Sequence, residues 1–416
     1  MLLICLAGQA SAAEPIQLRM SWWGGNEVHK AQLETLRRFE ARHPQIKVKA
    51  EYTGWVGHLE RITTQIAGGT APDVMQINWN WLVLFSRDGL GFYDLNRLSD
   101  TLDLTQFDAD TLAPGIIDGR LNALPPAMAA RLLYLNKTTW DKAGLPLPTS
   151  WDALLAAGPV FRDRLGADYY PLDLPFQDVV ALTRAWIVQD TGLPLVDVTH
   201  KRLNASVAQL TAAAQLYQRM VADHVIPAAR ERASYGHVAP HEMRPWISGR
   251  YGGTYQWISA IGKSADTLEP GQQLVLAPHP LKPGARDAGL LYRPAMMLAI
   301  NKDTAHPREA ALLLDFLLND PEAVRLMGVR RGVPVSATAR ATLAADGVLT
   351  GLAWDGLQQL TTLPHGVRES GWFEHARVRD TFVDLIEQLG YGVIDAPTAG
   401  QRLHDDVNRV LARTIR

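Results

Sequence analysis

Three strand–turn–helix units follow one another at the start of the chain, and they restrict its fold more than any other feature. Polar and apolar residues alternate over 16–20 and 46–52, and 74–77 is an apolar run, so each stretch predicts a strand. Residues 27–43 and 59–66 lie between them and repeat apolar residues at helical spacing. Because strands and helices alternate, we expect an α/β fold with a largely parallel sheet and helices on both faces.

The turn that follows each of these strands carries tryptophan, glycine or asparagine. In an open α/β sheet, ligands bind beyond the carboxyl ends of the strands, where these turns lie. Flat indole faces beside an amide suit a sugar ring, which has apolar C–H faces and a rim of hydroxyl groups. The candidate contacts in these turns are Trp22, Trp23, Asn26, Trp55, Asn78, Trp79, Asn80 and Trp81. For any one tryptophan, packing in the core is an equally good interpretation, but a binding surface explains the set better.

Further candidates lie later in the chain. Residues 251–257 form an aromatic strand and turn, which adds Tyr255 and Trp257 as stacking residues. Three arginines also stand at edges of predicted strands or loops: Arg131, Arg293 and Arg331. An arginine that faces a cleft can bind a carboxylate through two N–H donors and would then select an acidic sugar. The alternative for each arginine is a solvated or structural ion pair.

The rest of the chain is mostly helical by pattern. Helices are predicted over 151–165, 179–190, 207–224, 307–318, 352–361, 375–389 and 401–413. Apolar strands are predicted over 132–135, 274–277 and 295–301. We find no repeat of the period that a solenoid requires.

The composition excludes several classes of function. The chain has 416 residues, which is enough for about two or three domains. Its formal net charge is only -2 and its charges form no long run, so we expect neither nucleic acid nor an anionic membrane surface as a partner. No apolar run reaches the roughly 18 residues that span a bilayer.

The first thirteen residues differ from the rest and predict a secretory signal peptide. An apolar start is followed by small residues of the kind found at cleavage sites, so we expect cleavage near Ala12 or Ala13 and a periplasmic protein. No positive charge precedes the short apolar core, which indicates that the start of the signal peptide is incomplete. Cys5, the single cysteine, lies inside this segment, so the mature chain would contain no disulfide and no cysteine chemistry.

Catalytic and metal motifs are weak. The sequence has no phosphate-binding loop, nucleophile elbow or dinucleotide fingerprint. His237 and His241 flank a proline and would not share a helical face, so we expect no metal site there. A glycosidase needs two carboxylates about 5–10 Å apart. Glu27, Asp73 and Asp94 are available for that role, although Asp73 follows a proline at a strand start and is better explained as structural.

At four places the sequence resembles a known family. These are the opening turn at 22–25, the stretch 66–74 with its Gly-Gly-Thr-Ala-Pro-Asp pattern, 135–146 with Trp151 after it, and parts of 299–334 that end in Arg-Gly-Val-Pro. In this order they resemble the extracellular sugar-binding proteins of ABC importers, the family 1 solute-binding proteins that include the maltodextrin binders.

The resemblance implies a two-lobed periplasmic-binding-protein type II fold whose lobes close on the sugar about a hinge. It implies an N-terminal lobe of 14–127 plus 299–334 and a C-terminal lobe of 128–298 plus 335–416. It places ligand contacts at 78–81, at the aromatic stretch that contains Tyr255 and Trp257, and near Trp372. The chain departs from the maltodextrin binders at Ala129-Ala130-Arg131, where they carry a contacting acid, which argues against maltodextrin as the ligand.

We therefore expect a monomeric periplasmic substrate-binding protein of a carbohydrate ABC importer. It would capture a sugar or oligosaccharide and deliver it to the transmembrane permease subunits, without catalysis, cofactor or metal. A ligand that contacts both lobes would favour the closed state. Two alternatives stay open, a secreted carbohydrate-active enzyme and a protein that presents sugar to a membrane sensor.

Overall fold

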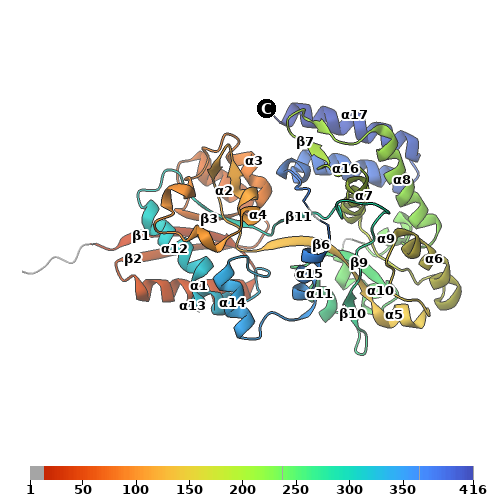
Figure 1. Ribbon diagram of the computed structural model, residues 1–416, viewed down its shortest axis with the longest axis horizontal. Coiled ribbons are helices and arrows are strands. Elements are labelled where there is room, and N and C mark those ends of the chain that lie inside the picture. Colours follow the sequence, from red (N-terminus) through yellow and green to blue (C-terminus); the bar gives the residue numbers. More distant parts are fainter. Residues whose placement is uncertain (1–13, 237, 365, 416) are drawn as a thin grey trace, which may run out of the picture. The chain divides into compact units, whose positions relative to one another are not determined.

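The structure is a computed structural model that describes residues 14–236, 238–364 and 366–415 (Figure 1). The chain divides into two compact units, each assembled from separate stretches of sequence. Unit 1 contains 14–77, Phe85–Pro126 and Met296–Asp346, and unit 2 contains Asn78–Leu84, Ala127–Ala295 and 347–415. The expected signal peptide and His237 lie outside the described residues.

Unit 1 is built on a four-stranded sheet of order β12-β3-β1-β2. Its strands are β1 (Ile16–Trp23), β2 (Ile46–Thr53), β3 (Val74–Ile77) and β12 (Met297–Ile300). β1 runs parallel to β2, with Ile16 opposite Ile46, and parallel to β3. β12 returns antiparallel to β3, with Met297 opposite Ile77. The predicted parallel sheet is therefore present in unit 1, with one antiparallel edge strand.

The helices of unit 1 pack around this sheet. They are α1 (Asn26–Arg42), α2 (His58–Ala67), α4 (Ala109–Leu112), α12 (Pro307–Asn319), α13 (Pro321–Met327) and α14 (Ala337–Ala345), with the short η2 (Leu95–Leu98), η3 (Leu104–Gln106) and η4 (Ala113–Gly115) and the hairpin β4 (Ile116–Ile117) and β5 (Arg120–Leu121). Apolar spacing buries Phe39 of α1, whose ring lies 5.5 Å from that of Phe316 on α12. Asp320 caps α13 by accepting from the backbone N–H of Glu322. α14 was not predicted; it packs on α12 and α13 and so groups 335–346 with unit 1, not with the expected C-terminal lobe.

Unit 2 is organised around one long buried strand, β6 (Met128–Asn136). Its partners are β9 (Gly253–Trp257), β10 (Leu274–Leu276) and β11 (Tyr292–Pro294). All three run antiparallel to β6, so the expectation of a parallel sheet is wrong for this unit. The reason is that the sequence supplies apolar strands here without the strand–helix alternation that marks the first 81 residues.

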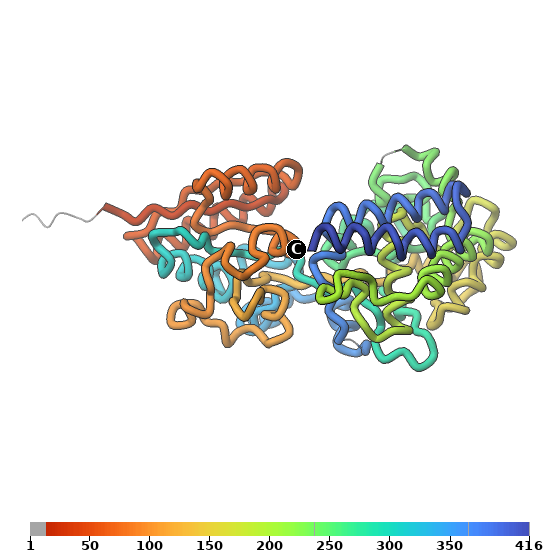
Figure 2. The backbone as a smooth tube through the Cα atoms, turned by 90° about the horizontal axis from the view of Figure 1, so that it is seen from above, coloured from red at the N-terminus to blue at the C-terminus, as the bar shows by residue number. Residues whose placement is uncertain are grey.

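Helices make up most of the remainder of unit 2. They are η1 (Trp79–Trp81), α3 (Leu82–Phe85), α5 (Lys137–Lys142), α6 (Trp151–Leu165), α7 (Phe176–Thr191), α8 (Val207–Ala222), α9 (Ala229–Ala233), η5 (Pro240–Glu242), α10 (Arg244–Ile247), α11 (Ile261–Asp266), α15 (Gly351–Thr362), η6 (Gly371–Glu374), α16 (Ala376–Gly390) and α17 (Ala396–Thr414), and β7 (Val196–Asp197) pairs with β8 (Arg202–Leu203). α17 lies beside α8 and α16, as the dark blue tube of Figure 2 shows. Their apolar faces enclose the larger hydrophobic core of the molecule, and Val407 and Leu411 of α17 are fully buried in it.

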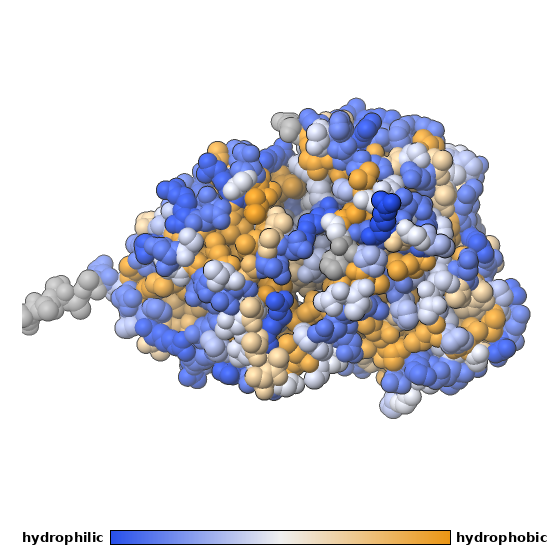
Figure 3. Space-filling view, in the orientation of Figure 1, coloured by the Kyte–Doolittle hydropathy of each residue, from blue (hydrophilic) through white to orange (hydrophobic). Residues whose placement is uncertain are grey.

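The side of the molecule drawn in Figure 3 shows no single apolar face that would mark a site. On the side drawn in Figure 3, hydrophilic and hydrophobic residues are interspersed over both units. Within the described part of the chain, the longest helices are too short or too polar to cross a bilayer. The location of a binding site must therefore come from the arrangement of particular side chains.

Candidate ligand-binding site

The register of the β6 sheet brings an indole and two guanidinium groups to one face. Arg131 lies opposite Trp257 of β9, and Arg293 of β11 lies opposite Ala129. Opposed residues in an antiparallel pair share a face, and so do residues two apart on one strand. Arg131, Trp257 and Arg293 therefore share a face of unit 2.

The side chains meet in the way this register requires. Arg131 Cζ lies 4.7 Å from the centroid of the Trp257 ring, and Arg293 Cζ lies 4.1 Å from the same centroid. Both distances are within the range of a cation–π contact. Burial is the main cause that lowers the pKa of Arg293, with Glu374 opposing it and Arg131 adding to it. Two like charges thus lie close together on one aromatic ring.

Glu374 provides a negative charge beside Arg293. Arg293 Nε lies 2.8 Å from Glu374 Oε2, and the indole N–H of Trp79 donates to the same carboxylate oxygen. Asn80 Nδ2 donates to the backbone oxygen of Glu374 at 2.9 Å. A Cβ at Gly371 would come within 3.3 Å of Asn80 Cα, so a glycine there permits the close approach of η6 to η1.

These contacts explain why 78–84 group with unit 2 rather than with the expected N-terminal lobe. Asn78 caps η1 by accepting from the backbone N–H of Trp79, which fixes the start of that turn. Trp79 and Trp81 are each only 5% exposed, so their rings lie mostly inside the protein.

A pocket of about 150 Å³ opens beside this cluster. Its charged lining consists of three arginines and one glutamate: Arg131, Arg293, Arg379 and Glu374. Trp257, Phe373 and Phe382 supply aromatic rings, and Gln177 at the start of α7 supplies a neutral amide. The pocket therefore offers aromatic faces, hydrogen-bond donors and an excess of positive charge.

A buried ion pair holds Arg131 in place. Its guanidinium donates to the Asp178 carboxylate of α7 and, at 3.3 Å, to the backbone oxygen of Tyr255. The Asp178 side chain is 2% exposed, and burial raises its pKa while the charge of Arg131 opposes that rise. The hydrogen bonds of this pair hold the Arg131 guanidinium over the ring of Trp257. Removing either partner would leave an uncompensated buried charge.

Three predicted contacts lie in cores. Trp22 is fully buried, stacks on Tyr52 at 5.1 Å and donates its indole N–H to His29 Nδ1 at 3.1 Å. Tyr255 is fully buried, and burial raises its pKa to about 12. Trp372 is 6% exposed and packs in the same core cluster as Tyr255. For these three rings the structure favours the packing interpretation that the sequence left open.

The other predicted contacts of unit 1 belong to a different unit from the arginine cluster. The rings of Trp23 and Trp55 meet edge to face at 5.2 Å, and Trp55 is 53% exposed. Asn26 is exposed at the first position of α1. All three residues lie at or just after the carboxyl ends of β1 and β2, where the strand pattern predicted candidate contacts.

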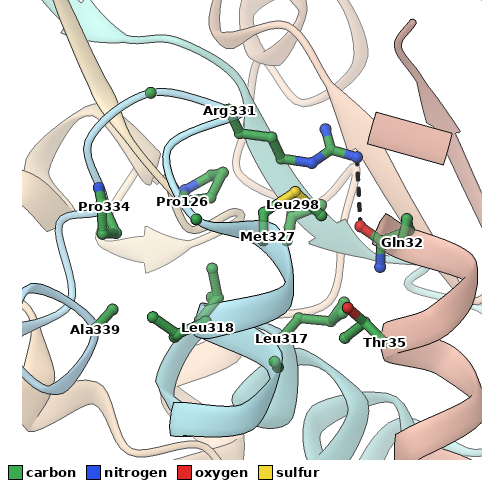
Figure 4. Close-up of a pocket in the computed structure, with 14 residues that line it drawn as sticks. Gln32, Thr35, Pro126, Leu298, Leu317, Leu318, Met327, Arg331, Pro334 and Ala339 are labelled. Atoms are coloured by element: carbon green, nitrogen blue, oxygen red, sulfur yellow. Dashed lines mark hydrogen bonds between the residues drawn. The ribbon is translucent and has the colours of Figure 1, made fainter. Parts of the chain in front are cut away.

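Arg331 lies in unit 1 at one end of an apolar pocket (Figure 4). Its guanidinium donates to Gln76 Oε1 at 2.6 Å and to Gln32 Oε1 at 3.4 Å; the latter bond is dashed in Figure 4. Burial lowers the pKa of Arg331 to about 10, so it stays charged at neutral pH. Within the described chain its hydrogen-bond acceptors are uncharged, unlike those of Arg131 and Arg293.

The carboxylates considered for catalysis have structural partners. Asp73 accepts from the backbone N–H of Arg19 and from the Thr304 hydroxyl. Asp94 caps η2, and Glu27 is paired with Lys30 on the surface. In the described residues no group of histidine, cysteine or carboxylate side chains has the arrangement of a metal site. His241 lies in η5.

The sequence did not reveal Glu374, Asp178, Arg379 and Gln177. Glu374 follows Trp372 by two positions, and Asp178 lies near the start of a predicted helix, yet lone carboxylates carry no sequence signature of their partners. Strand register was the missing information, because it shows that Arg131 and Arg293 share a face and so require nearby counter-charges.

Comparison with known proteins identifies the family. The profile of the bacterial extracellular solute-binding proteins matches residues 26–324. A protein of Brucella abortus (strain 2308) named as a binding protein is 31% identical over 147 residues, which are 35% of this chain and 35% of that protein. The match thus spans about a third of the length of this curated relative.

Two solved structures match nearly the whole chain. A periplasmic oligogalacturonide binding protein from Yersinia enterocolitica, in complex with saturated digalacturonic acid, is 46% identical over 96% of this chain and 100% of that chain, with a TM-score of 0.88. A de novo designed cysteine esterase is 44% identical over 97% of this chain and 100% of that chain, with a TM-score of 0.91. One fold can host unrelated activities, so the esterase activity remains a property of the designed protein.

These matches confirm the α/β fold and the family that the four sequence stretches predicted. The family is one of binding proteins located outside the cytoplasm. On the profile match, which covers well over half of its length, the chain belongs to the bacterial extracellular solute-binding proteins.

Proposed function

We propose that the chain is the substrate-binding protein of a carbohydrate ABC importer and that its ligand is an acidic oligosaccharide. The observation that carries the proposal is the pair of guanidinium groups that lie 4.1 and 4.7 Å from the centroid of the Trp257 ring. An aromatic face takes the C–H face of a sugar, and a guanidinium takes a carboxylate with two parallel hydrogen bonds. A uronate ring carries both features.

The charge of the pocket supports an acid over a neutral sugar. Three arginines and one glutamate line it, and that glutamate already accepts from Trp79 and pairs with Arg293. The Yersinia protein, 46% identical, was solved with saturated digalacturonic acid, which is a ligand of this chemistry. An acid at this position of β6 would repel such a ligand, whereas this chain has Arg131 there.

Capture without chemistry also fits the pocket better than hydrolysis. A glycosidase places two carboxylates about 5–10 Å apart on either side of the scissile bond. Among the described residues that line the arginine pocket, Glu374 is the single carboxylate, and it is engaged by Arg293 and Trp79. The permease subunits of the importer would then receive the ligand, and the mature chain would act in the periplasm after signal-peptide cleavage near Ala12 or Ala13.

The test is a calorimetric titration of the mature chain with digalacturonic acid and with the neutral digalactose of the same linkage. We expect the acid to bind at least about tenfold more tightly, since hydrogen bonds to charged groups are the stronger ones. Arg293→Ala should weaken binding of the acid at least about 30-fold, because truncating one partner of a buried charge pair costs about 2 kcal/mol or more.

Arg377→Ala is the matched control, because Arg377 is exposed on α16 and does not line the pocket. It should leave the affinity unchanged. Equal affinities for digalacturonic acid and for the neutral digalactose would overturn the proposal that the ligand is acidic. Turnover of the acid by the mature chain would overturn a pure binding role, and binding of neither sugar would overturn the carbohydrate proposal.

A further inference from the structure

A second pocket of unit 2 takes no part in the arginine cluster. Its volume is about 420 Å³. That is within the range of about 300–1,000 Å³ in which small-molecule sites fall. It lies where the start of α7, the middle of α8, α9 and the end of α16 come together. The lining residues used below are Phe176, Tyr217, Arg232, Ala233, Glu387 and Tyr391.

Aromatic rings form part of its wall. The rings of Phe176 and Tyr391 lie 6.1 Å apart at an interplanar angle of 58°. Tyr217 is buried, and a Cβ at Gly390 would lie 2.5 Å from its hydroxyl oxygen, so helix α16 packs directly against it. Burial raises the pKa of Tyr217 to about 12, so this hydroxyl stays neutral and can both donate and accept a hydrogen bond.

The charges of this pocket differ from those of the arginine pocket. Arg232 Nε donates to Asp173 Oδ1 at 2.8 Å, and Arg232 Nη2 donates to Asp173 Oδ2 at 3.4 Å. The Asp173 side chain is 1% exposed, so a buried carboxylate already opposes the charge of Arg232. Glu387 is exposed and adds a negative charge at the pocket. An anionic ligand would meet Glu387 without an uncompensated cation to offset it.

We propose that this pocket is a second ligand site and that it binds a neutral pyranose ring. The rings of Phe176 and Tyr391 offer faces for the C–H side of a sugar, as in other sites where aromatic side chains meet hydroxylated ligands. The hydroxyls of such a ring can accept from Arg232 and Tyr217 and donate to Glu387. The pocket thus combines apolar faces with both donors and acceptors, and it carries no excess positive charge.

The proposal does not depend on the acidic ligand of the arginine pocket. Unit 2 would hold two sites of different charge preference, one at Trp257 and one at Tyr391. Asp178 and Asp173, the buried carboxylates behind the two sites, interact electrostatically. Among the described residues the two pockets share no lining residue, so variants of residues that line one pocket and not the other can follow the occupancy of each site separately.

Saturation-transfer NMR on the mature chain tests the proposal. The probes are the methyl β-pyranosides of galactose, glucose and xylose at millimolar concentration, with methyl galactosiduronate as the carboxylated twin of the first. We expect at least one neutral pyranoside to receive saturation from the protein and the carboxylated twin to bind at least about tenfold more weakly. Trp257→Ala should leave the neutral pyranoside signal in place.

Ala233→Trp fills the pocket from the exposed end of α9, so it should abolish the signal without disturbing a core. Ser234→Trp is the matched control, because Ser234 is the next exposed residue and does not line the pocket. Absence of binding by all three neutral pyranosides would overturn the proposal. So would a signal that survives Ala233→Trp, or equal binding of the carboxylated twin.

A second pair of variants avoids adding bulk. Glu387→Ala removes an acceptor from an exposed position and should weaken the neutral pyranoside about fivefold to tenfold. Asp384→Ala, one turn earlier on α16 and also exposed, should leave the affinity as in the wild type. An unchanged affinity in Glu387→Ala would contradict the proposal that a hydroxyl of the pyranose ring donates to Glu387 in this pocket.

Discussion

Arginine is kept inside the protein in two ways, one in each unit. In unit 2, Arg131 bonds to the buried Asp178 carboxylate, and Arg293 lies 2.8 Å from Glu374. In unit 1, Arg331 donates to the amide oxygens of Gln76 and Gln32 and to a methionine sulfur. The three guanidinium groups are chemically identical, but Arg131 and Arg293 contact a carboxylate, whereas the acceptors of Arg331 in the described chain are uncharged.

The two arrangements differ in how well they stabilise the buried charge and in whether that charge is available to an anion. A buried pair is electrically balanced, so the protein can hold two guanidinium groups close to Trp257 without losing its fold. Arg331 has dipoles but no counter-charge, which stabilises the cation less and leaves its charge available to an anion. The same residue type therefore serves as a fixed part of a site in unit 2 and as an uncompensated charge in unit 1.

The largest expected effect follows from breaking a pair. Asp178→Asn leaves Arg131 buried without its counter-charge, so we expect the free energy of unfolding to fall by about 3–5 kcal/mol. Urea unfolding with linear extrapolation measures this change.

Asp384→Asn provides the control for this prediction. Asp384 is exposed on α16, so loss of its charge should change the free energy of unfolding by no more than about 0.5 kcal/mol. If Asp178→Asn behaved like this control, the pair would not stabilise the fold and the contrast between the units would fail.

The sequence predicted the α/β part of the fold because its signals are local. The alternation of polar and apolar residues over 16–20 and 46–52 can be recognised within a few residues. The antiparallel sheet around β6 was missed because its pairings join residues more than 100 positions apart, such as Arg131 and Trp257. Apolar runs show that such strands exist but not which way their partners run.

The candidate site was predicted in part for the same reason. Residue types identified Trp257, Arg131 and Arg293, which the structure brings together in unit 2. Residue types also selected Trp22 and Tyr255, whose side chains are fully buried. Adjacent positions on a strand point to opposite faces, so composition alone could not tell which aromatic ring faces a pocket.

A buried base without any counter-charge should be neutral, and His279 of unit 2 allows a test. Burial lowers its pKa from about 6.5 to about 4, and His279 Nε2 lies 3.0 Å from the backbone oxygen of Ala288. The unfolded chain binds a proton here below pH 6.5, whereas the folded chain does so only near pH 4. The free energy of unfolding should therefore fall by about 3 kcal/mol between pH 7 and pH 4 on account of this group.

His279→Gln should remove that part of the pH dependence while keeping a donor for Ala288. Urea titrations across this pH range, compared between wild type and variant, isolate the contribution of His279 from those of other histidines. His200→Gln is the control, because His200 is exposed and paired with Asp197 on the surface. An identical slope in wild type and His279→Gln would show that the buried imidazole does not stay neutral.

Substitution of Arg331 should change the free energy of unfolding least, and its result decides whether the arginines of the two units differ. Arg331→Met removes a charge that has no carboxylate partner and places a flexible apolar side chain beside Leu298 and Met327 in the pocket of Figure 4. The free energy of unfolding should stay within about 1 kcal/mol of the wild type or rise, since burying an uncompensated charge is costly. Arg330→Met, at the exposed neighbour that donates to Leu326 and Met327 oxygens, is the matched control. A loss of about 3 kcal/mol in Arg331→Met would instead make this arginine a structural element equivalent to Arg131, and the difference between the two units would disappear.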